Sequence, residues 1–156
     1  MDAEKFTKKS LEVIESCEKL AYEYNNQELT QAHLMYALVT VEDSLIAKLL
    51  TNMGINMDAF TGECEKLVAN RPKVSGGQLF TSPEFSKALI QAEKEAKQMG
   101  DDYISVEHIF LGLLEKADKD IKRVINAYGI TRGKFLEVLA NIRGNRKVES
   151  DNPEDT

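Results

Sequence analysis

The sequence has no tryptophan, few cysteines and histidines, and no long apolar stretch among its 156 residues. No segment approaches the roughly 18–20 apolar residues that a membrane-spanning helix needs. The opening MDAEKFTKKS contains no hydrophobic run of the kind found in secretory signals. We therefore expect a cytoplasmic chain that does not bind a membrane. The net charge of −6, without any block of Lys or Arg, also disfavours nucleic acid as a partner.

The few residues that usually bind metals are too scattered to form a site. Cys17, Cys64, His33 and His108 are the only cysteines and histidines, and no two of them have a ligand spacing such as CxxC or HxxxH. A closed zinc site is thus disfavoured. Because both cysteines lie in predicted helices, we expect them to be free, buried thiols in a reducing compartment.

Catalytic motifs are also missing. The only Gly-Lys pair, Gly133-Lys134, is followed by Phe135 and lacks the earlier glycine of a phosphate-binding loop. The patterns GxGxxG, GxSxG and HExxH do not occur. We therefore predict that this chain has no enzymatic activity and no cofactor or metal of its own. Loss of a turnover on changing His33 or His108, without unfolding, would reopen the alternative of an enzyme.

What the sequence does contain is an internal repeat. Residues 29–60 align with residues 104–135 without a gap, at an offset of 75, and seven of the 32 positions are identical. The identical pairs include a histidine (His33/His108), a glycine and a phenylalanine. The period is too long for a solenoid unit. The repeat predicts two copies of a four-helix unit, packed face to face.

Capping signals indicate where the helices begin and end. Thr7 is a predicted N-cap, with Phe6 and Leu11 as a hydrophobic staple across it. Helix ends are predicted at glycines that favour a left-handed conformation, Gly54 and its counterpart Gly129. Further caps are Thr30, Ser105, Asn56 and Thr131. The last predicted helix buries Phe135, Val138, Leu139 and Ile142 and ends at Gly144. Strands are not expected, because alternating β-branched residues are absent.

These signals divide the chain into four parts. Residues 1–69 form the first repeat, and residues 70–83, rich in Pro and Gly, form a linker over the surface. Residues 84–144 form the second repeat. Residues 145–156 are polar without an apolar period, and we expect a disordered tail that begins a tether.

Each repeated histidine lies three residues after its N-cap, Thr30 or Ser105. At this position a side chain can bond back to the cap, so we expect a structural role for both. Acidic residues near the same helix start, such as Glu107, are favoured there by the helix dipole alone.

Together, these features resemble the N-terminal domain of the Clp/heat-shock AAA+ unfoldases, a double Clp-N repeat. The signature [IL]-[ST]-x-x-H-[IL] occurs as LTQAHL and as ISVEHI, and an apolar helix end with a glycine follows in each copy. The resemblance extends to about Val148. It implies an all-α fold in which two pseudo-symmetric four-helix repeats pack into one globular domain. The connector RPKVSGG and the run GDDYISVEHIFLGLL are most similar to the disaggregase branch.

The resemblance also implies a function. The disaggregases are hexameric, ATP-driven chaperones that extract polypeptides from aggregates together with the DnaK system. Their N-domain engages exposed apolar segments of unfolded or aggregated proteins, whereas ATP and Mg²⁺ bind in separate ATPase domains. We accordingly expect a monomer for this domain alone and a homohexamer for a parent protein.

Three polar positions match the substrate-binding residues of the family: Thr7 at the opening cap, Asp101 in GDDY, and Glu107 in the ISxE motif. Each also has a plain structural explanation, which for Thr7 is capping alone. The acidic pair would favour segments with Lys or Arg nearby.

The family also implies an apolar groove along the first helix of the second repeat, here formed by Phe85, Leu89 and Met99. Core packing is the structural alternative for these side chains. Gln91 and Glu95 stand where some relatives carry leucines, so the groove is expected to be narrower or more polar in this chain.

Two further readings keep the fold and change the partner. A ClpC- or ClpA-type N-domain docks adaptors and degradation tags for a protease. A free-standing double repeat would act as an adaptor or scaffold. The connector sequence favours the disaggregase branch over the ClpC or ClpA type, whereas a natural gene that stops near residue 156 would support the adaptor or scaffold.

Overall fold

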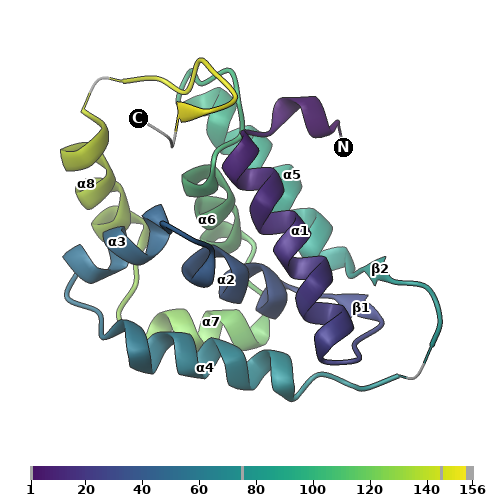
Figure 1. The fold of residues 1–156 in the computed structure, drawn as a ribbon. Coiled ribbons are helices and arrows are strands. Elements are labelled where there is room, and N and C mark those ends of the chain that lie inside the picture. The colour runs from purple at the N-terminus through teal and green to yellow at the C-terminus, as the bar shows by residue number, and fades with distance from the viewer. Residues whose placement is uncertain (1, 75, 145, 154–156) are drawn as a thin grey trace.

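The computed structural model describes residues 2–74, 76–144 and 146–153, and shows a helical bundle (Figure 1). A short 3-10 turn, η1, precedes the first four helices. The elements of the first half are η1 (Ala3–Lys5), α1 (Lys8–Glu23), β1 (Glu28–Leu29), α2 (Gln31–Thr40), α3 (Leu45–Asn52) and α4 (Met57–Ala69).

The second half repeats this order. Its elements are β2 (Phe80–Thr81), α5 (Pro83–Gln98), α6 (Val106–Glu115), α7 (Lys119–Ala127) and α8 (Arg132–Arg143). Both ends of α1 and α2 recur 75 residues later in α5 and α6, and the bounds of the other two pairs shift by at most one residue at either end. The predicted fold, two pseudo-symmetric four-helix repeats, is confirmed.

The predicted caps explain these boundaries. The Thr7 hydroxyl accepts a hydrogen bond from the Ser10 N–H at 3.2 Å, and Asn56 and Thr131 cap α4 and α8 in the same way. After α3, Gly54 has a φ of +84°, a left-handed conformation that a side chain would strain.

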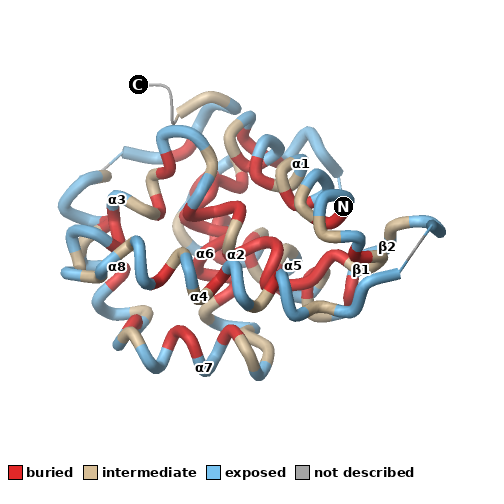
Figure 2. Tube along the Cα trace, turned by 60° about the horizontal axis from the view of Figure 1, so that its bottom comes forward, coloured by how far each residue is buried: buried red, intermediate tan, exposed pale blue. Residues whose placement is uncertain are grey.

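The two halves share one core, with α2 and α6 at its centre (Figure 2). Gln31, fully buried at the start of α2, joins the halves. Its amide donates hydrogen bonds to the carbonyls of Glu84 and Lys116 and accepts one from the Asp118 N–H, at 2.8–3.0 Å. Because an unpaired buried backbone group is costly, this side chain stabilises the interface between the repeats.

The first two helices of each half pack against each other at different distances in the two halves. α5 and α6 pack more tightly than α1 and α2. A Cβ atom on Gly112 would lie only 2.3 Å from the Ala88 carbonyl oxygen, so glycine is required at this crossing. The corresponding residue of α2 is Ala37, which is fully buried.

The prediction that the chain has no strands is wrong in one detail. β1 and β2 pair in parallel over two residues each, and Phe6 forms an isolated parallel bridge with Ile104. The two pairings are related by the same offset of 75. They arise because the residues that precede α1 and α5 each lie along the opposite half. The linker predicted over residues 70–83 thus contains β2 and the first residue of α5.

Two apolar side chains are more exposed than the sequence suggests. Phe6 is buried, but Leu11, its predicted staple partner, is 37% exposed. Ile142, predicted to be buried, is 39% exposed. Cys17 and Cys64 are free and buried, as predicted, and burial raises the pKa of the Cys64 thiol to about 12.

The tail also differs from the sequence prediction of disorder. Val148 is 4% exposed, and its carbonyl accepts hydrogen bonds from the N–H groups of Asp102 and Tyr103 at 2.8 and 3.3 Å. Further along, the Asp151 carbonyl accepts one from the Lys8 N–H at 2.6 Å. The described part of the tail, residues 146–153, therefore lies against the second repeat and the start of α1.

Candidate functional site

The three polar candidate residues come together near the N-terminus of α1 and the start of α6. Thr7 is buried, and its hydroxyl donates to Ser10 Oγ at 3.0 Å, which in turn donates to the Ile104 carbonyl at 2.9 Å. This chain of bonds fastens α1 to the segment before α6. Thr7 therefore shapes the site from beneath and does not lie on its surface.

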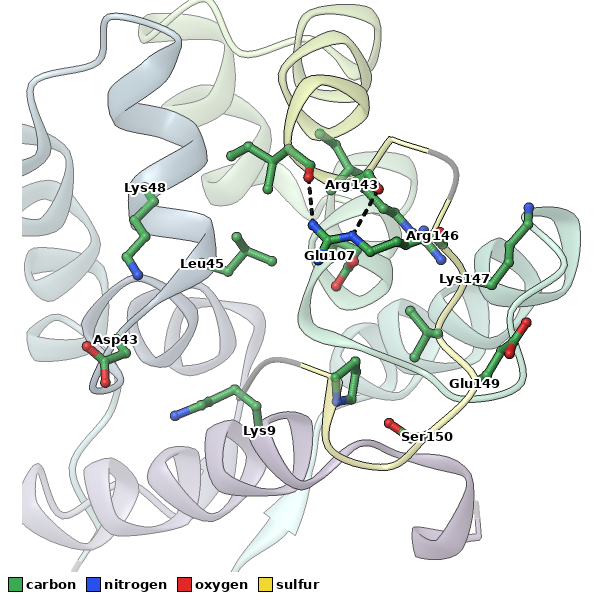
Figure 3. A pocket seen from close by; sticks show the side chains of 14 residues that line it. Lys9, Asp43, Leu45, Lys48, Glu107, Arg143, Arg146, Lys147, Glu149 and Ser150 are labelled. Carbon is green, nitrogen blue, oxygen red and sulfur yellow. Dashed lines mark hydrogen bonds between the residues drawn. The ribbon is translucent and has the colours of Figure 1, made fainter. Parts of the chain in front are cut away.

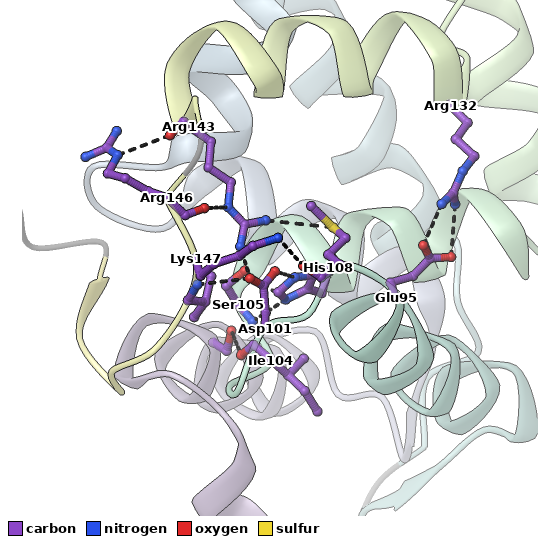
Figure 4. Close-up of polar contacts among 12 residues, drawn as sticks. Glu95, Asp101, Ile104, Ser105, His108, Arg132, Arg143, Arg146 and Lys147 are labelled. Atoms are coloured by element: carbon purple, nitrogen blue, oxygen red, sulfur yellow. Dashed lines mark hydrogen bonds and ion pairs between the residues drawn. The ribbon is translucent and has the colours of Figure 1, made fainter.

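Asp101 occupies the centre of a buried polar cluster (Figure 4). One carboxylate oxygen accepts a hydrogen bond from His108 Nε2 at 2.7 Å, and the other accepts one from the Val148 N–H at 3.0 Å and pairs with the Arg143 guanidinium. Burial opposes the charged form, but these three donors together hold the pKa of Asp101 below its ordinary value. Asp101 is thus an anion that is fully engaged within the domain.

His108 confirms the predicted capping role. Its Nδ1 accepts a hydrogen bond from the Ser105 N–H at 2.9 Å, so the ring proton is on Nε2, facing Asp101. Burial lowers the pKa of His108, while the negative charges of Glu107 and Asp101 oppose that shift. The neutral ring links the cap of α6 to the Asp101 cluster.

Glu107 is different, because its side chain is buried beside a cleft. The residue is 6% exposed, and its Oε1 atom has no hydrogen-bond partner among the residues that the structure describes. It lines a cleft of about 800 Å³ between the N-terminus of α1, α3, α8 and the tail (Figure 3). A buried carboxylate oxygen without a partner is costly, and a bound donor would satisfy it.

The rest of the cleft combines an apolar wall with charged edges. The wall consists of Leu45, Leu139, Ile142 and Val148. Around it lie basic side chains, Lys9, Lys48, Arg146 and Lys147, and the acidic side chains Asp43 and Glu149. Such a cleft is suited to an extended apolar segment with charged neighbours.

The apolar candidates on α5 lie elsewhere. Phe85 is a core residue with 2% exposure, and Leu89 and Met99 are partly buried against the same core. Met99 contacts Arg143 through its sulfur at 3.7 Å. None of the three lines the cleft.

The polar residues noted on α5 are paired with each other and with α8. Glu95, 1% exposed, receives two hydrogen bonds from Arg132 at 2.6 and 2.9 Å and one from Gln91 at 3.0 Å. The hydrogen bonds from Arg132 lower the pKa of Glu95 against the effect of burial. The face of α5 that carries Gln91 and Glu95 is therefore occupied by a network of hydrogen bonds and an ion pair with Arg132.

Sequence reasoning missed the wall of the cleft. The helical period predicts Leu139 and Ile142 as core residues of the last helix, and nothing in such a period distinguishes a core side chain from one that lines a cleft. The only available signal was the tail, whose Val148 stands alone among polar residues.

The described ranges contain no group of side chains arranged to hold a metal ion. Nor does any of their helices have the length and apolar character needed to cross a membrane.

Comparison with known proteins agrees with this fold. The family described as Clp repeat (R) N-terminal domain matches residues 5–128, and the chain belongs to this family. A curated relative, the chaperone protein ClpB of Nitratidesulfovibrio vulgaris, is 40% identical over 162 aligned residues. The alignment covers the whole of this chain but only 19% of the relative, so the chain spans about a fifth of such a protein.

Solved structures show the same architecture. The Hsp104 N-terminal domain from Candida albicans superposes with a TM-score of 0.84 at 21% identity, covering 97% of this chain and 99% of that domain. A ClpV N-domain, solved in complex with a VipB peptide, superposes with a TM-score of 0.71 at 18% identity, covering 96% and 90% of the two chains. The chain is thus a Clp repeat domain similar to those of ClpB chaperones.

Proposed function

We propose that this domain engages exposed apolar segments of unfolded or aggregated polypeptides for an ATP-driven disaggregase. The observation that carries the proposal is the cleft, where an apolar wall adjoins the partnerless Oε1 of Glu107. The ClpB relatives and the peptide bound to a ClpV N-domain support it.

Each candidate residue has a part in this proposal. Glu107 contacts the polypeptide and favours segments that carry Lys, Arg or a free amine beside the apolar residues. Thr7 and Asp101 position the segments that border the cleft. Phe85, Leu89 and Met99 hold α5 in place beneath the site.

In the parent protein, ATP and Mg²⁺ would bind in ATPase domains outside this chain, and the DnaK system would cooperate with the assembled hexamer. A single domain binds weakly, with a dissociation constant on the order of micromolar or higher. Six tethered copies would raise the effective concentration of binding sites around one aggregate.

The test is a titration of the ¹⁵N-labelled chain with an unfolded, non-aggregating protein, followed by NMR. We expect the largest shifts around Glu107, Leu45 and Ile142. Ile142→Asp should weaken binding about fivefold or more, equivalent to roughly 1 kcal/mol of lost apolar contact. Glu107→Gln should weaken binding of segments with Lys or Arg more than of uncharged ones.

The chain offers a matched control. Ile90 on α5 is 50% exposed but does not line the cleft, so Ile90→Asp adds the same charge at another surface. We expect it to leave binding unchanged. Loss of binding in Ile90→Asp with normal binding in Ile142→Asp would place the interaction on α5 and overturn the proposed site.

A further inference from the structure

One side of the cleft is formed by the C-terminal tail of the domain itself. Val148 is buried in the tail; its N–H donates to the Asp101 carboxylate, and its carbonyl accepts from the N–H groups of Asp102 and Tyr103. Lys147 donates from Nζ to the Met99 carbonyl at 2.7 Å. These are the contacts that an extended polypeptide makes when it binds through its backbone, with one apolar side chain as anchor.

The three family-matched positions all lie at this tail. Asp101 accepts from the Val148 N–H, Thr7 precedes the Lys8 N–H that donates to the Asp151 carbonyl, and Glu107 shares the cleft with Val148. The tail thus covers the place at which an incoming segment would reach them.

The first repeat contains a counterpart that shows how such a segment is normally held. After α4, the Pro72 carbonyl accepts a hydrogen bond from Asn26, the residue that corresponds to Asp101, at 3.1 Å. Lys73 donates to the Tyr24 carbonyl at 3.1 Å, as Lys147 does to Met99, which corresponds to Tyr24. In each half, the segment that follows the fourth helix therefore docks on its own half in a similar manner.

The two docked segments differ in how their far ends are fastened. In the first half the chain continues into β2, which pairs with β1 and leads directly into α5. In the second half the place of β2 is taken by Phe6, paired with Ile104, so the tail has no strand to enter. Its described far end is held by the hydrogen bond between Lys8 and Asp151. The tail thus lacks the strand pairing that fixes the end of its counterpart in the first half.

We propose that residues 147–151, which form one side of the cleft, are bound there as an internal ligand, and that an incoming polypeptide displaces them and takes their place. The inference rests on the proposed function and adds to it the kind of segment that binds. The preferred segment is extended, with an aliphatic residue in the place of Val148 and a basic residue directly before it. Release of the tail on binding would lengthen the tether to the rest of a parent protein.

The experiment uses the 156-residue chain and a synthetic probe, the capped octapeptide Arg-Lys-Val-Glu-Ser-Asp-Asn-Pro, which copies residues 146–153. Val148→Asp places a charge in the buried anchor position and should release the tail. In the original chain the tail occupies the site most of the time, so the apparent affinity for the probe is reduced to the fraction of molecules whose site is free. We therefore expect Val148→Asp to bind the probe at least about tenfold more tightly than the original chain does. A probe with Asp in place of Val should not bind either chain.

The matched control is Val74→Asp. Val74 is 41% exposed in the linker of the first half, so this variant adds an equal charge without touching the tail. It should bind the probe as the original chain does. Circular dichroism verifies folding of all variants. Protection of the Val148 amide from hydrogen exchange, lost on adding saturating unfolded protein, gives a second measurement on the original chain.

Failure of this inference and of the proposed function can be distinguished. Equal probe binding by Val148→Asp and the original chain, with an unprotected Val148 amide, would overturn the internal ligand. If unfolded protein still bound normally in that case, the proposed function would stand alone. Tighter probe binding without any binding of unfolded protein would establish the tail contact and reject the proposed function.

Discussion

The two halves of this domain share their backbone plan but differ in how they satisfy their buried polar groups. In the first half, His33 bonds through Nε2 to Asn26 at 2.9 Å, and in the second half His108 bonds to Asp101 at 2.7 Å. The neutral amide needs no counter-charge, whereas the carboxylate is joined by Arg143. The duplicated scaffold thus gives the buried histidine a neutral partner in one half and a charged partner in the other, beside the cleft.

A similar contrast is found where the first helix of each half contacts or lies near the fourth. Glu95 on α5 pairs with Arg132 on α8, but the corresponding residues of α1 and α4 are Leu20 and Met57, both partly buried against the core. Two charged, paired residues of the second half therefore stand at the positions of two apolar residues in the first. This equivalence allows each half to serve as the control for the other.

The largest effect is expected from Gly112→Ala, which makes the α5–α6 crossing resemble the α1–α2 crossing. The added Cβ would meet the Ala88 carbonyl oxygen at 2.3 Å, and backbone cannot move aside cheaply. We expect a loss of about 4 kcal/mol or more in the free energy of unfolding, measured with urea.

The control is Gly62→Ala on α4, where a Cβ meets nothing within 4 Å. It should stabilise the domain by up to about 1 kcal/mol, because alanine favours the helix. A small cost for Gly112→Ala would mean that the two helix pairs cross in the same way.

The next effect separates the two histidines by their response to acid. Burial, aided by the positive charge of Arg71, lowers the pKa of His33 to about 4, well below the ordinary value of 6.5. The folded state therefore binds fewer protons than the unfolded state between these values. Stability should fall as the pH drops from about 6.5 to 4, by about 3 kcal/mol from this group.

NMR titration of the His33 and His108 imidazole rings measures both pKa values directly. Asn26→Asp, which gives His33 the partner that His108 has, should raise the pKa of His33. A His33 pKa at or above 6.5 in the original chain would contradict the assigned role of burial.

A smaller effect is expected at the ion pair. Arg132→Met leaves Glu95 buried without its partner and should cost about 2 kcal/mol, since Arg132 is 39% exposed in its side chain and water compensates in part. The double variant Glu95→Leu/Arg132→Met copies the first half and should recover most of that loss. Unfolding in urea of Arg132→Met, Glu95→Leu and the double variant gives the three values of a double-mutant cycle, and a double loss equal to the sum of the two single losses would show that the pair does not interact.

Much of the fold was predictable because its signals are local. Thr7, Asn56 and Thr131 cap helices through bonds to residues only three positions away, and both capping histidines act over the same short distance. The strand pairs were not predictable in this way, since Phe6 and Ile104 are distant in sequence and neither segment has a strand pattern.

The candidate site was predictable only in part. Glu107 lies in the cleft that we propose as the site, but Thr7 and Asp101 proved to be buried beneath it, and Phe85, Leu89 and Met99 belong to the core side of α5. A family motif identifies positions that matter for the site without indicating whether a side chain faces the ligand or supports a neighbour.

The sequence by itself determined the two repeats, their eight helices and most helix ends, because helical period and caps depend on residues within one or two turns of each other. Only the tertiary structure decided that Gln31 joins the halves, that Gly112 allows a close crossing, and that Val148 docks on Asp101. Those contacts join residues far apart in the chain. They depend on the shape left between packed helices, which no local pattern records.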